Sequence, residues 1–371
     1  MSTRIAVAGA GLLGRLLAFE LLQRGHAVTL FDPAPSLVQA PLAGDPARAA
    51  AWTAAGMLSP TAELECANED VFRLGLDSLQ RWPQIVATLA GAGLPVAFQR
   101  QGSLLLAHRG DEGAARRVVD LLRHKAPADH APQALSLADL RTLEPDVHGP
   151  AHGWLLPHEG LVHTVQTMTA LGQFALDHGV DWRGNTPVTG LSPGRVHTAQ
   201  GTEHFDQVFD VRGTGARQPV GTANGSSTGN TPSMGDVRGV RGEVFWLHAP
   251  GVVLNRPVRL LHPRWRVYVV PRPGDLVVVG ATEIESEDRS PVSVRSALEL
   301  LSAAHSVLPG LSEARIVHSE ANLRPALPDN LPRTHTEPGL TRINGLFRHG
   351  WLIAPALVAQ ALHTVDEAVP A

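Results

Sequence analysis

The chain has 371 residues, of which 43% are hydrophobic and 18% are charged, and this composition supports a sizeable core divided between two domains or two interleaved lobes. Its formal net charge of −4 argues against a nucleic acid or an anionic membrane as a partner held by bulk electrostatics. The single cysteine, Cys66, excludes an intrachain disulfide and a cysteine-rich metal site, and no apolar run reaches the roughly 18 residues that a transmembrane helix requires.

The first thirty residues have the pattern of a dinucleotide-binding βαβ unit. Residues 5–8 are typical of a buried strand, residues 13–22 have the broad apolar surface of a helix, and residues 27–32 form a second strand. The glycines that follow the first strand have G-x-G-x-x-G spacing: Gly9, Gly11 and Gly14. This spacing permits a tight turn, close approach of the backbone to a pyrophosphate, and close packing of helix on sheet. Asp32, at the tip of the second strand, is placed to bind an adenosine ribose, so the unit favours NAD or FAD over NADP.

The next hundred residues combine loops, helices and one strand. An Ala- and Pro-rich loop follows Asp32. The small-residue segment 53–65 fits either a backbone that passes close to a flat ring or the start of a helix packed on the sheet, and composition alone favours the helix. Apolar spacing then predicts a helix over 70–92, a strand over 102–109, a helix over 114–124, and a helix over 136–145 with Ser136 as its N-cap.

A histidine-rich segment occupies residues 148–163. Its four histidines are His148, His152, His158 and His163. The intervening glycines and prolines deny them the i, i+4 spacing of a helical metal site, so the pattern predicts a loop and no metal. A helix over residues 164–175 is expected to follow.

Short strands and turns come next. Two short strands are predicted within residues 179–191, and a strand over 205–211 leads into a second glycine turn, at Gly213 and Gly215. Residues 218–235 are rich in Gly, Ser, Thr and Asn and have few large apolar residues. We expect them to form a flexible surface loop.

The pattern changes to β from residue 237. Strands are predicted over residues 241–247, 258–263, 265–272 and 276–282, and a turn over 272–275 joins the last two in a hairpin. Two helices complete the chain, over residues 293–308 and 352–363. The second is expected to open with Ala354 and Pro355, because proline suits a first helical turn.

Six motifs, in order along the whole chain, resemble those of the D-amino-acid-oxidase-like flavoproteins, and most closely the glycine oxidases of thiamine biosynthesis. They are GAGLLG with Asp32, TAAGMLSPTAE, VRGEVFWL, YVVPRPGDLVVVGAT, LRPALPDNLPR and GLFRHGWLIAPA. The resemblance implies an α/β (α+β) fold in which a Rossmann-like FAD-binding domain of the glutathione-reductase type is interleaved with a β-rich substrate domain. We expect residues 1–90, 150–217 and 315–371 to form the former, residues 91–149 and 236–314 the latter, and residues 218–235 the flexible loop.

The resemblance also implies the site residues. Contacts to FAD are implied at Leu12, Leu13, Asp32, Pro33, Ala50, Ala51, Ala55, Gly56, Met57, Val188 and the run Leu346, Phe347, Arg348, His349, Gly350, Trp351 and Leu352, with the two glycine turns beside them. The active site is implied at Tyr268, Arg324 and Arg348. FAD is expected to be non-covalent, since Cys66 lies too early in the chain for attachment of the kind that some sarcosine oxidases use. The chain departs from the family pattern at VRGTGAR and at the active-site entrance, where the alignment gives Arg266.

The chemistry of these three side chains agrees with the resemblance. Tyr268 is the only tyrosine and is predicted mid-strand, on the face opposite Val267 and Val269. Arg324 offers a bidentate partner to the carboxylate of an amino acid, with a surface salt bridge as the alternative. Arg348 opens the last strand-to-helix turn, where it is placed to lie against flavin or substrate.

Together these patterns predict an FAD-dependent oxidase of a small amino acid or amine, with glycine, sarcosine or a D-amino acid as the substrate type. Hydride would pass from the substrate α carbon to flavin N5, and reoxidation by O₂ would give H₂O₂. The alternatives are a flavin-dependent amino-acid dehydrogenase that does not use O₂ and an NAD-linked dehydrogenase. We expect a cytoplasmic protein, because residues 1–8 lack a secretory pattern, and a homo-oligomer is compatible with the sequence.

Overall fold

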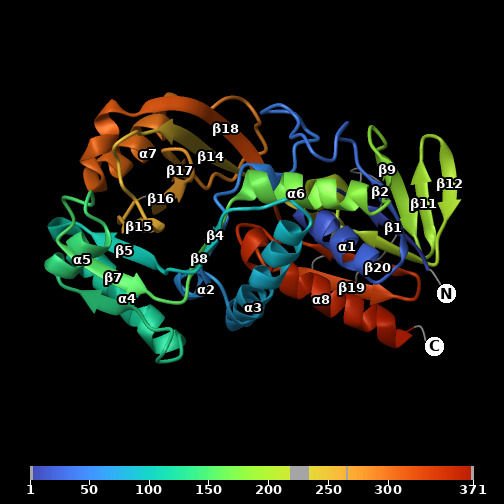
Figure 1. Ribbon diagram of the computed structural model, residues 1–371, viewed down its shortest axis with the longest axis horizontal. Coiled ribbons are helices and arrows are strands. Elements are labelled where there is room, and N and C mark those ends of the chain that lie inside the picture. Colours follow the sequence, from blue (N-terminus) through green and yellow to red (C-terminus); the bar gives the residue numbers. More distant parts are fainter. Residues whose placement is uncertain (1–2, 218–233, 265, 369–371) are drawn as a thin grey trace.

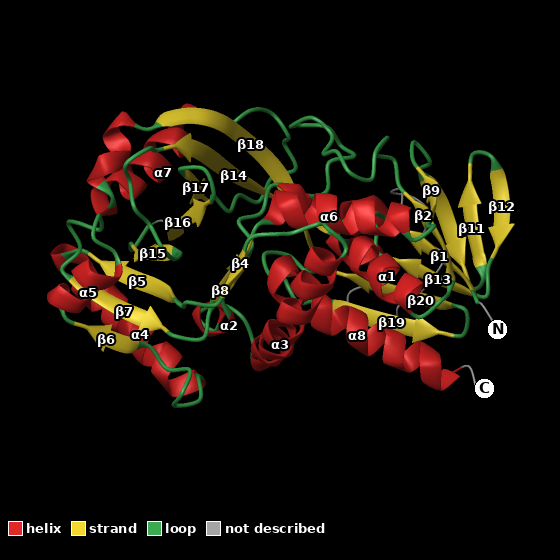
Figure 2. Cartoon of the chain, in the orientation of Figure 1, coloured by secondary structure: helices red, strands yellow, loops and turns green. Residues whose placement is uncertain are grey.

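Two large β-sheets lie at opposite ends of the molecule in the computed structural model, which describes residues 3–217, 234–264 and 266–368 (Figure 1). A small three-stranded sheet runs between them, as Figure 2 shows for β4 and β8. Its strands are β3 (Met57–Leu58), β8 (Gly160–Val162) and β4 (Phe98–Gln99), with the short helix α2 (Pro60–Glu63) directly after β3.

The first large sheet has six strands and carries the N-terminal βαβ unit. In spatial order they are β19 (Arg333–Glu337), β20 (Leu340–Asn344), β13 (Gln207–Asp210), β1 (Arg4–Ala8), β2 (Ala27–Phe31) and β9 (Asp181–Arg183). All neighbouring pairs are parallel except β19 with β20. Because the carboxyl ends of parallel strands meet at one edge, the loops after β1, β2, β13 and β20 converge there.

Helices cover this sheet and form the largest apolar core with it. They are α1 (Leu12–Gln23), α6 (Thr164–Asp177), α8 (Gly350–Ala368) and α3 (Glu69–Gly91). Helix α1 packs against α6 and α8, and α3 packs against α8. A separate three-stranded sheet, formed by β10 (Val188–Ser192), β11 (Arg195–Thr198) and β12 (Gly201–His204), packs through Val196 against Ala6 and Val208 on the other face of the six-stranded sheet.

The second large sheet has eight strands and a separate core. In spatial order they are β18 (Arg315–Ala326), β14 (Arg238–His248), β17 (Leu276–Gly280), β16 (Arg266–Arg272), β15 (Val258–Leu261), β5 (Ser103–Ala107), β7 (His152–Leu156) and β6 (Gln133–Leu135). Its helices are α4 (Glu112–Lys125), α5 (Leu137–Leu143) and α7 (Val294–Val307). Helix α7 packs on one face, against Val267 and Val269 of β16, so the other face of β16 is left for the interior of the molecule.

The structure confirms the expected fold class and most of the predicted helices and strands, with several corrections. The prediction of a loop for the histidine-rich segment is wrong, because the segment forms β7 and β8. Its Gly and Pro residues lie mainly at the ends of these two short strands and between them. Strands β11 and β12 were not predicted. Helix α8 begins at Gly350, before Ala354, and contains Pro355. The carbonyl that Pro355 cannot pair, that of Trp351, accepts a hydrogen bond from Trp82 Nε1 at 3.1 Å, which lets the helix tolerate the proline.

Two strands lie beyond the domain boundaries expected from the sequence. Strands β7 and β18 both belong to the eight-stranded sheet, although residues 150–217 and 315–371 were assigned to the FAD-binding domain. The division of the chain at these points therefore remains a proposal. Residues 218–233 of the expected flexible loop lie outside the described residues, and Met234–Asp236 is a short 3₁₀ turn.

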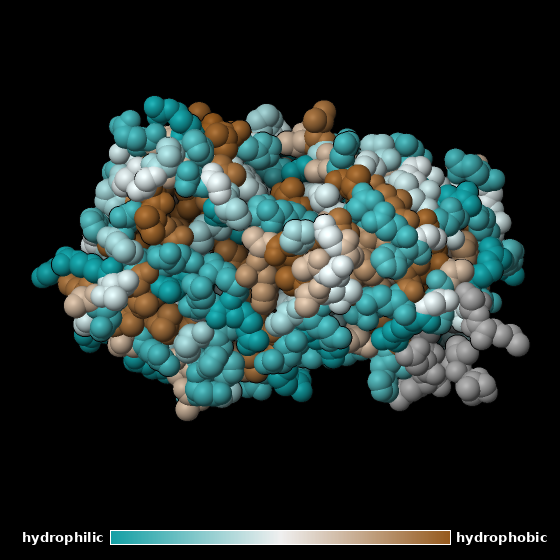
Figure 3. Space-filling view, in the orientation of Figure 1, coloured by the Kyte–Doolittle hydropathy of each residue, from teal (hydrophilic) through white to brown (hydrophobic). Residues whose placement is uncertain are grey.

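The hydropathy of the surface and of the helices bears on whether the chain could span a membrane. The face in Figure 3 is largely hydrophilic, with small apolar patches scattered over it, as is usual for a folded domain. Among the described residues, no helix is both long and apolar enough to span a bilayer. In the same part of the chain, no group of three or more His, Cys, Asp or Glu side chains is arranged to hold a metal ion.

Candidate active site

A cavity of about 1670 Å³ extends from the carboxyl edge of the six-stranded sheet to the inner face of the eight-stranded sheet. A pocket for a single small ligand usually measures about 300–1,000 Å³, so this cavity has room for a dinucleotide and a small substrate together. One part of the cavity, here called the cofactor limb, is lined by the glycine turn and Asp32. The other part, here called the substrate limb, is lined by Tyr268 and Arg324.

The glycine turn after β1 has the backbone that a pyrophosphate site requires. Gly9 has φ +105°, and a Cβ there would lie 2.7 Å from the Val211 carbonyl oxygen. A Cβ on Gly14 would lie 1.8 Å from the Gly9 oxygen, so Gly14 permits the close packing of α1. A Cβ on Gly11 would touch only Ala49, at 3.7 Å, on the cavity side. Because no side chain caps α1, its first N–H groups are free to receive an anion.

Asp32 fixes the geometry of this turn. Its carboxylate accepts hydrogen bonds from the backbone N–H of Ala10 at 2.6 Å and of Ala34 at 2.8 Å. Burial raises the pKa of Asp32, against the opposing effect of these two bonds and of Arg15. The carboxylate lines the cavity beside the turn, which suits a ribose hydroxyl.

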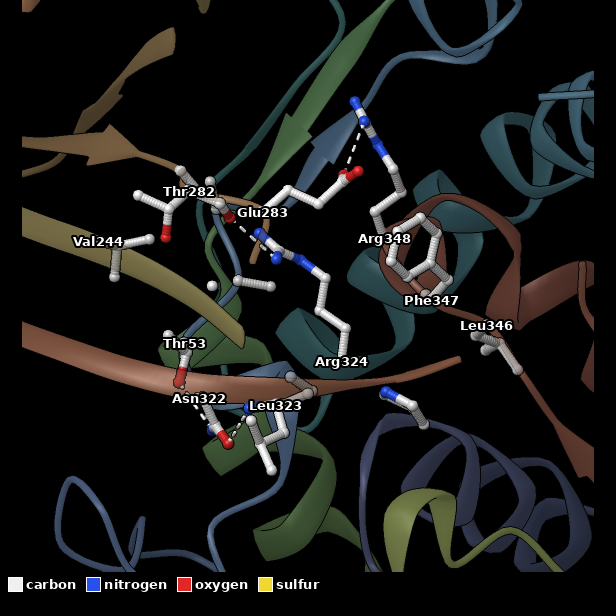
Figure 4. Close-up of a pocket in the computed structure, with 18 of the residues that line it drawn as sticks. Thr53, Val244, Thr282, Glu283, Asn322, Leu323, Arg324, Leu346, Phe347 and Arg348 are labelled. Carbon is white, nitrogen blue, oxygen red and sulfur yellow. Dashed lines mark hydrogen bonds and ion pairs between the residues drawn. The ribbon is translucent and has the colours of Figure 1, made fainter. Parts of the chain in front are cut away.

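The small-residue segment before β3 lines the middle of the cavity. Composition favoured a helix start here, but α2 begins only at Pro60, and the preceding residues form a 3₁₀ turn (Ala50–Trp52) and strand β3. Gly56 has φ +66° and lies so close to Val162 that a Cβ would be 2.1 Å from its carbonyl oxygen. Asn322 of β18 holds the segment in place, because its Nδ2 donates to the Thr53 hydroxyl at 2.9 Å (Figure 4).

Most of the cofactor residues expected from the sequence line this cavity. They are Gly9, Gly11, Leu12, Leu13, Asp32, Pro33, Ala50, Ala51, Ala55, Gly56, Met57, Val188, Gly213, Gly215, Leu346, Phe347, Arg348, Gly350 and Trp351. Three others lie behind the wall: Gly14 packs on Gly9, Leu352 packs near Gly75, and His349 contacts Glu63. This continuous lining, with the uncapped start of α1, fits a dinucleotide such as FAD.

Two glycines make room for the expected catalytic side chains on the inner face of the eight-stranded sheet. Tyr268 of β16 pairs across the sheet with Gly280, where a Cβ would lie 2.6 Å from the tyrosine hydroxyl. A Cβ on Gly242 would lie 2.4 Å from Arg324 Nη1. Tyr268 faces the side of β16 away from Val267 and Val269, as alternation predicted. Burial raises the pKa of Tyr268, so its hydroxyl is neutral at physiological pH.

Arg324 is a cation that contacts only uncharged partners. Its Nη1 donates to the carbonyl oxygens of Thr282 at 3.0 Å and of Arg241 at 3.3 Å (Figure 4). Within the described residues, it has no carboxylate within 4.0 Å and no other hydrogen bond. Burial lowers the pKa of Arg324, although the guanidinium remains charged at neutral pH. Its Nε and Nη2 groups are therefore available to an anion in the cavity.

Arg348, unlike Arg324, is held by carboxylates. Its Nε lies 3.0 Å from Glu63 Oε2. Its Nη1 lies 3.2 Å from Glu283 Oε2, the contact drawn in Figure 4. The charge of Glu63 outweighs burial and raises the pKa of Arg348. The turn that presents Arg348 includes Phe347 at φ +48°, a conformation that non-glycine residues rarely adopt.

Several cavity residues were not predicted from the sequence. Glu63 of α2 is the last residue of the TAAGMLSPTAE motif, but no role was predicted for it. Arg259 comes from β15, where no motif marks it, and Glu283 lies in the loop after β17. Gly242 and Gly280 did carry a signal, because glycine inside a strand often marks close approach of another group.

Comparison with known proteins places the chain in a family. The profile of the family described as "FAD dependent oxidoreductase" matches residues 4–362. The chain is 35% identical over 364 residues to the "Putative thiamine biosynthesis oxidoreductase ThiO" of Rhizobium etli, covering 96% of this chain and 94% of the relative. It is 27% identical to the "Glycine oxidase" of Geobacillus kaustophilus, covering 95% and 89%.

The fold agrees with solved structures. The crystal structure of glycine oxidase from Geobacillus kaustophilus superimposes with a TM-score of 0.80 and 25% identity, covering 100% of this chain and 96% of that one. The crystal structure of glycine oxidase from Bacillus cereus has a TM-score of 0.79 at 21% identity, covering 100% and 96%, and supports the fold alone. With a family profile that matches nearly the whole chain, the protein belongs to the family of FAD-dependent oxidoreductases.

Proposed function

We propose that the protein is an FAD-dependent oxidase of a small amino acid or amine, of the glycine, sarcosine or D-amino-acid type. The proposal rests on the surroundings of Arg324, whose guanidinium lines the cavity. Its hydrogen-bond partners are two backbone carbonyls, and no carboxylate of the described residues pairs with it. A partly buried cation without a counter-ion is costly, and the carboxylate of an amino acid supplies one with bidentate geometry.

FAD, when bound, supplies the hydride acceptor N5 and the site at which O₂ is reduced to H₂O₂. The residues that would hold it are the start of α1, Asp32, the segment around Ala50 and the turn before α8. Non-covalent binding is expected, because Cys66, the only cysteine, lies early in the chain and does not line the cavity.

The remaining chemistry is assigned to side chains of the eight-stranded sheet and the last turn. Arg324 binds the substrate carboxylate, and the neutral hydroxyl of Tyr268 donates a hydrogen bond that orients it. Arg348 closes the side of the site that meets the turn before α8. No protein base would be required at the α carbon, because the lone pair of a neutral amine can form the imine as hydride leaves that carbon, and positioning does most of the work.

The names of the relatives support the same reaction class. The Geobacillus relative is named as a glycine oxidase, and the Rhizobium relative is named for thiamine biosynthesis. A role in thiamine biosynthesis is therefore part of the proposal. A cytoplasmic location and a homo-oligomer remain predictions.

The proposal is tested by H₂O₂ formation from a panel of amines. Glycine, sarcosine and D-alanine are expected to give H₂O₂ together with the corresponding oxo acid, whereas methylamine, which has no carboxylate, is expected to react far more slowly. A flavin-dependent dehydrogenase would instead oxidise glycine only with an artificial electron acceptor, and an NAD-linked enzyme would purify without a flavin spectrum.

A further inference from the structure

Glu63 is a buried carboxylate surrounded by three cationic or basic side chains. It is the last residue of α2, and 8% of its surface is exposed. Its oxygens lie 3.0 Å from Arg348 Nε, 3.1 Å from Arg259 Nη2 and 3.2 Å from His349 Nδ1. Burial opposes ionisation, but these neighbours outweigh it and hold the pKa of Glu63 well below its usual range. Glu63 is therefore an anion at every pH at which the protein is expected to work.

The backbone of α2 holds this carboxylate at a fixed place. The Glu63 N–H donates to the Ser59 carbonyl at 3.1 Å, and the preceding N–H, of Ala62, donates to the buried Glu159 carboxylate at 2.9 Å. Arg259 approaches from β15, directly opposite Tyr268 in the sheet. Through its ion pairs with Arg259 and Arg348, Glu63 thus connects the strands β15 and β16, which carry Arg259 and Tyr268, to the turn before α8.

Three arginines that line the substrate limb, Arg259, Arg348 and Arg324, differ in their carboxylate partners. Glu63 is the only carboxylate within ion-pair distance of Arg259 in the described residues. Arg348 contacts Glu63 and also Glu283, which is 46% exposed and therefore more strongly screened by solvent. Arg324 contacts neither of them. One buried anion thus neutralises two arginines and leaves the third free.

We propose that Glu63 determines substrate specificity by acting as an internal anion, which occupies Arg259 and Arg348 and so restricts the site to amines with a single carboxylate. The inference rests on the proposed role of Arg324, to which that one carboxylate would bind. A second carboxylate on the substrate meets either the charge of Glu63 or arginines that are already neutralised, and it gains nothing to offset its desolvation. Without Glu63, the same two arginines become a binding site for it.

The test compares the binding of acetate and malonate to the FAD-containing protein, by calorimetry and by the change in the visible flavin spectrum. In the natural protein, malonate is expected to bind no more tightly than acetate. In Glu63→Gln, the Kd of malonate is expected to fall at least about tenfold, while the Kd of acetate changes less than about threefold. In turnover, the ratio of kcat/KM for iminodiacetate to that for glycine is expected to rise in the same variant.

Glu144→Gln is the matched control. Glu144 is also buried and pairs with an arginine, Arg256 at 3.0 Å, but neither residue lines the cavity. This variant is expected to leave the malonate-to-acetate ratio unchanged even if it lowers Tm. Glu63→Asp, which keeps the charge, is expected to keep most of the natural preference.

A double variant covers the case in which Glu63→Gln does not fold. Glu63→Gln/Arg259→Gln removes one charge of each sign and tests the same claim through Arg348 alone, with a smaller gain in malonate affinity. An unchanged ratio in a folded Glu63 variant, or an equal change in Glu144→Gln, would overturn the inference. Loss of acetate binding in Arg324→Ala would still support the proposed function in that case, so the two failures are distinguishable.

Discussion

Replacing Arg324 with alanine is expected to remove most of the affinity for the substrate carboxylate while FAD stays bound. In the structure, Nη1 is taken by two backbone carbonyls, which leaves Nε and Nη2 for a ligand. Two charge-assisted hydrogen bonds at about 1.5–3 kcal/mol each would be lost, and with partial compensation by water we expect a loss of about 3–4 kcal/mol. This corresponds to a fall in kcat/KM for glycine of about two to three orders of magnitude.

The assay is steady-state H₂O₂ formation with glycine and with methylamine, together with the flavin absorbance of each purified variant. Arg324→Lys is expected to recover only part of the loss, because an ammonium cannot make the planar two-point contact. Arg333→Ala, which removes a guanidinium paired with Asp329 outside the cavity, serves as a control and is expected to behave as the natural protein. Arg324 would not be the carboxylate-binding residue if Arg324→Ala slowed the oxidation of methylamine as much as that of glycine, or if the variant lost FAD.

Three further predictions follow from the local geometry. Gly242→Ala is expected to displace the Arg324 guanidinium and raise KM for glycine about tenfold or more with little change in Tm, because the new Cβ meets the end of a flexible side chain; an unchanged KM would contradict this. Gly11→Val is expected to purify with little FAD, since the new side chain would point to the cavity side of the turn, and full flavin occupancy would show that the turn is only structural. Burial, with the charge of Arg272, lowers the pKa of His163 to about 4, so the folded state resists protonation of this residue. The free energy of unfolding should therefore fall as pH decreases from about 6.5 to 4, by on the order of 3 kcal/mol from His163 alone. His163→Asn, which keeps an N-cap acceptor for α6, should flatten that slope in denaturant titrations, and equal slopes would contradict the assignment.

Local patterns in the sequence predicted the cofactor limb well, because its determinants lie close together along the chain. The glycine turn and Asp32 are separated by one helix and one strand, and their order is dictated by the βαβ connection. The side of the sheet that Tyr268 faces followed from alternation along one strand.

The charge arrangement of the substrate limb could not be predicted in the same way. Arg324 and Arg348 look alike in sequence, both arginines among prolines, glycines and apolar residues, yet only Arg348 is paired with carboxylates. The difference comes from Glu63, which lies more than 200 residues earlier in the chain. It reaches Arg348 because α2 directly follows β3, a strand of the small sheet between the two large ones. Similarly, Pro355 predicted the start of a helix, but α8 begins earlier, at Gly350. The helix tolerates the proline inside it because Trp82 donates a hydrogen bond to the Trp351 carbonyl, which Pro355 leaves unpaired, and no pattern in the sequence indicated this contact.

Anaerobic addition of glycine to the purified protein shows whether its flavin is reduced by an amino acid. The purified protein is expected to be yellow. Its visible flavin absorbance is expected to be bleached by glycine, sarcosine or D-alanine and to return when O₂ is admitted, with one H₂O₂ formed for each flavin reoxidised. A flavin spectrum that none of these amino acids bleaches, or that methylamine bleaches just as fast, would contradict the proposed function.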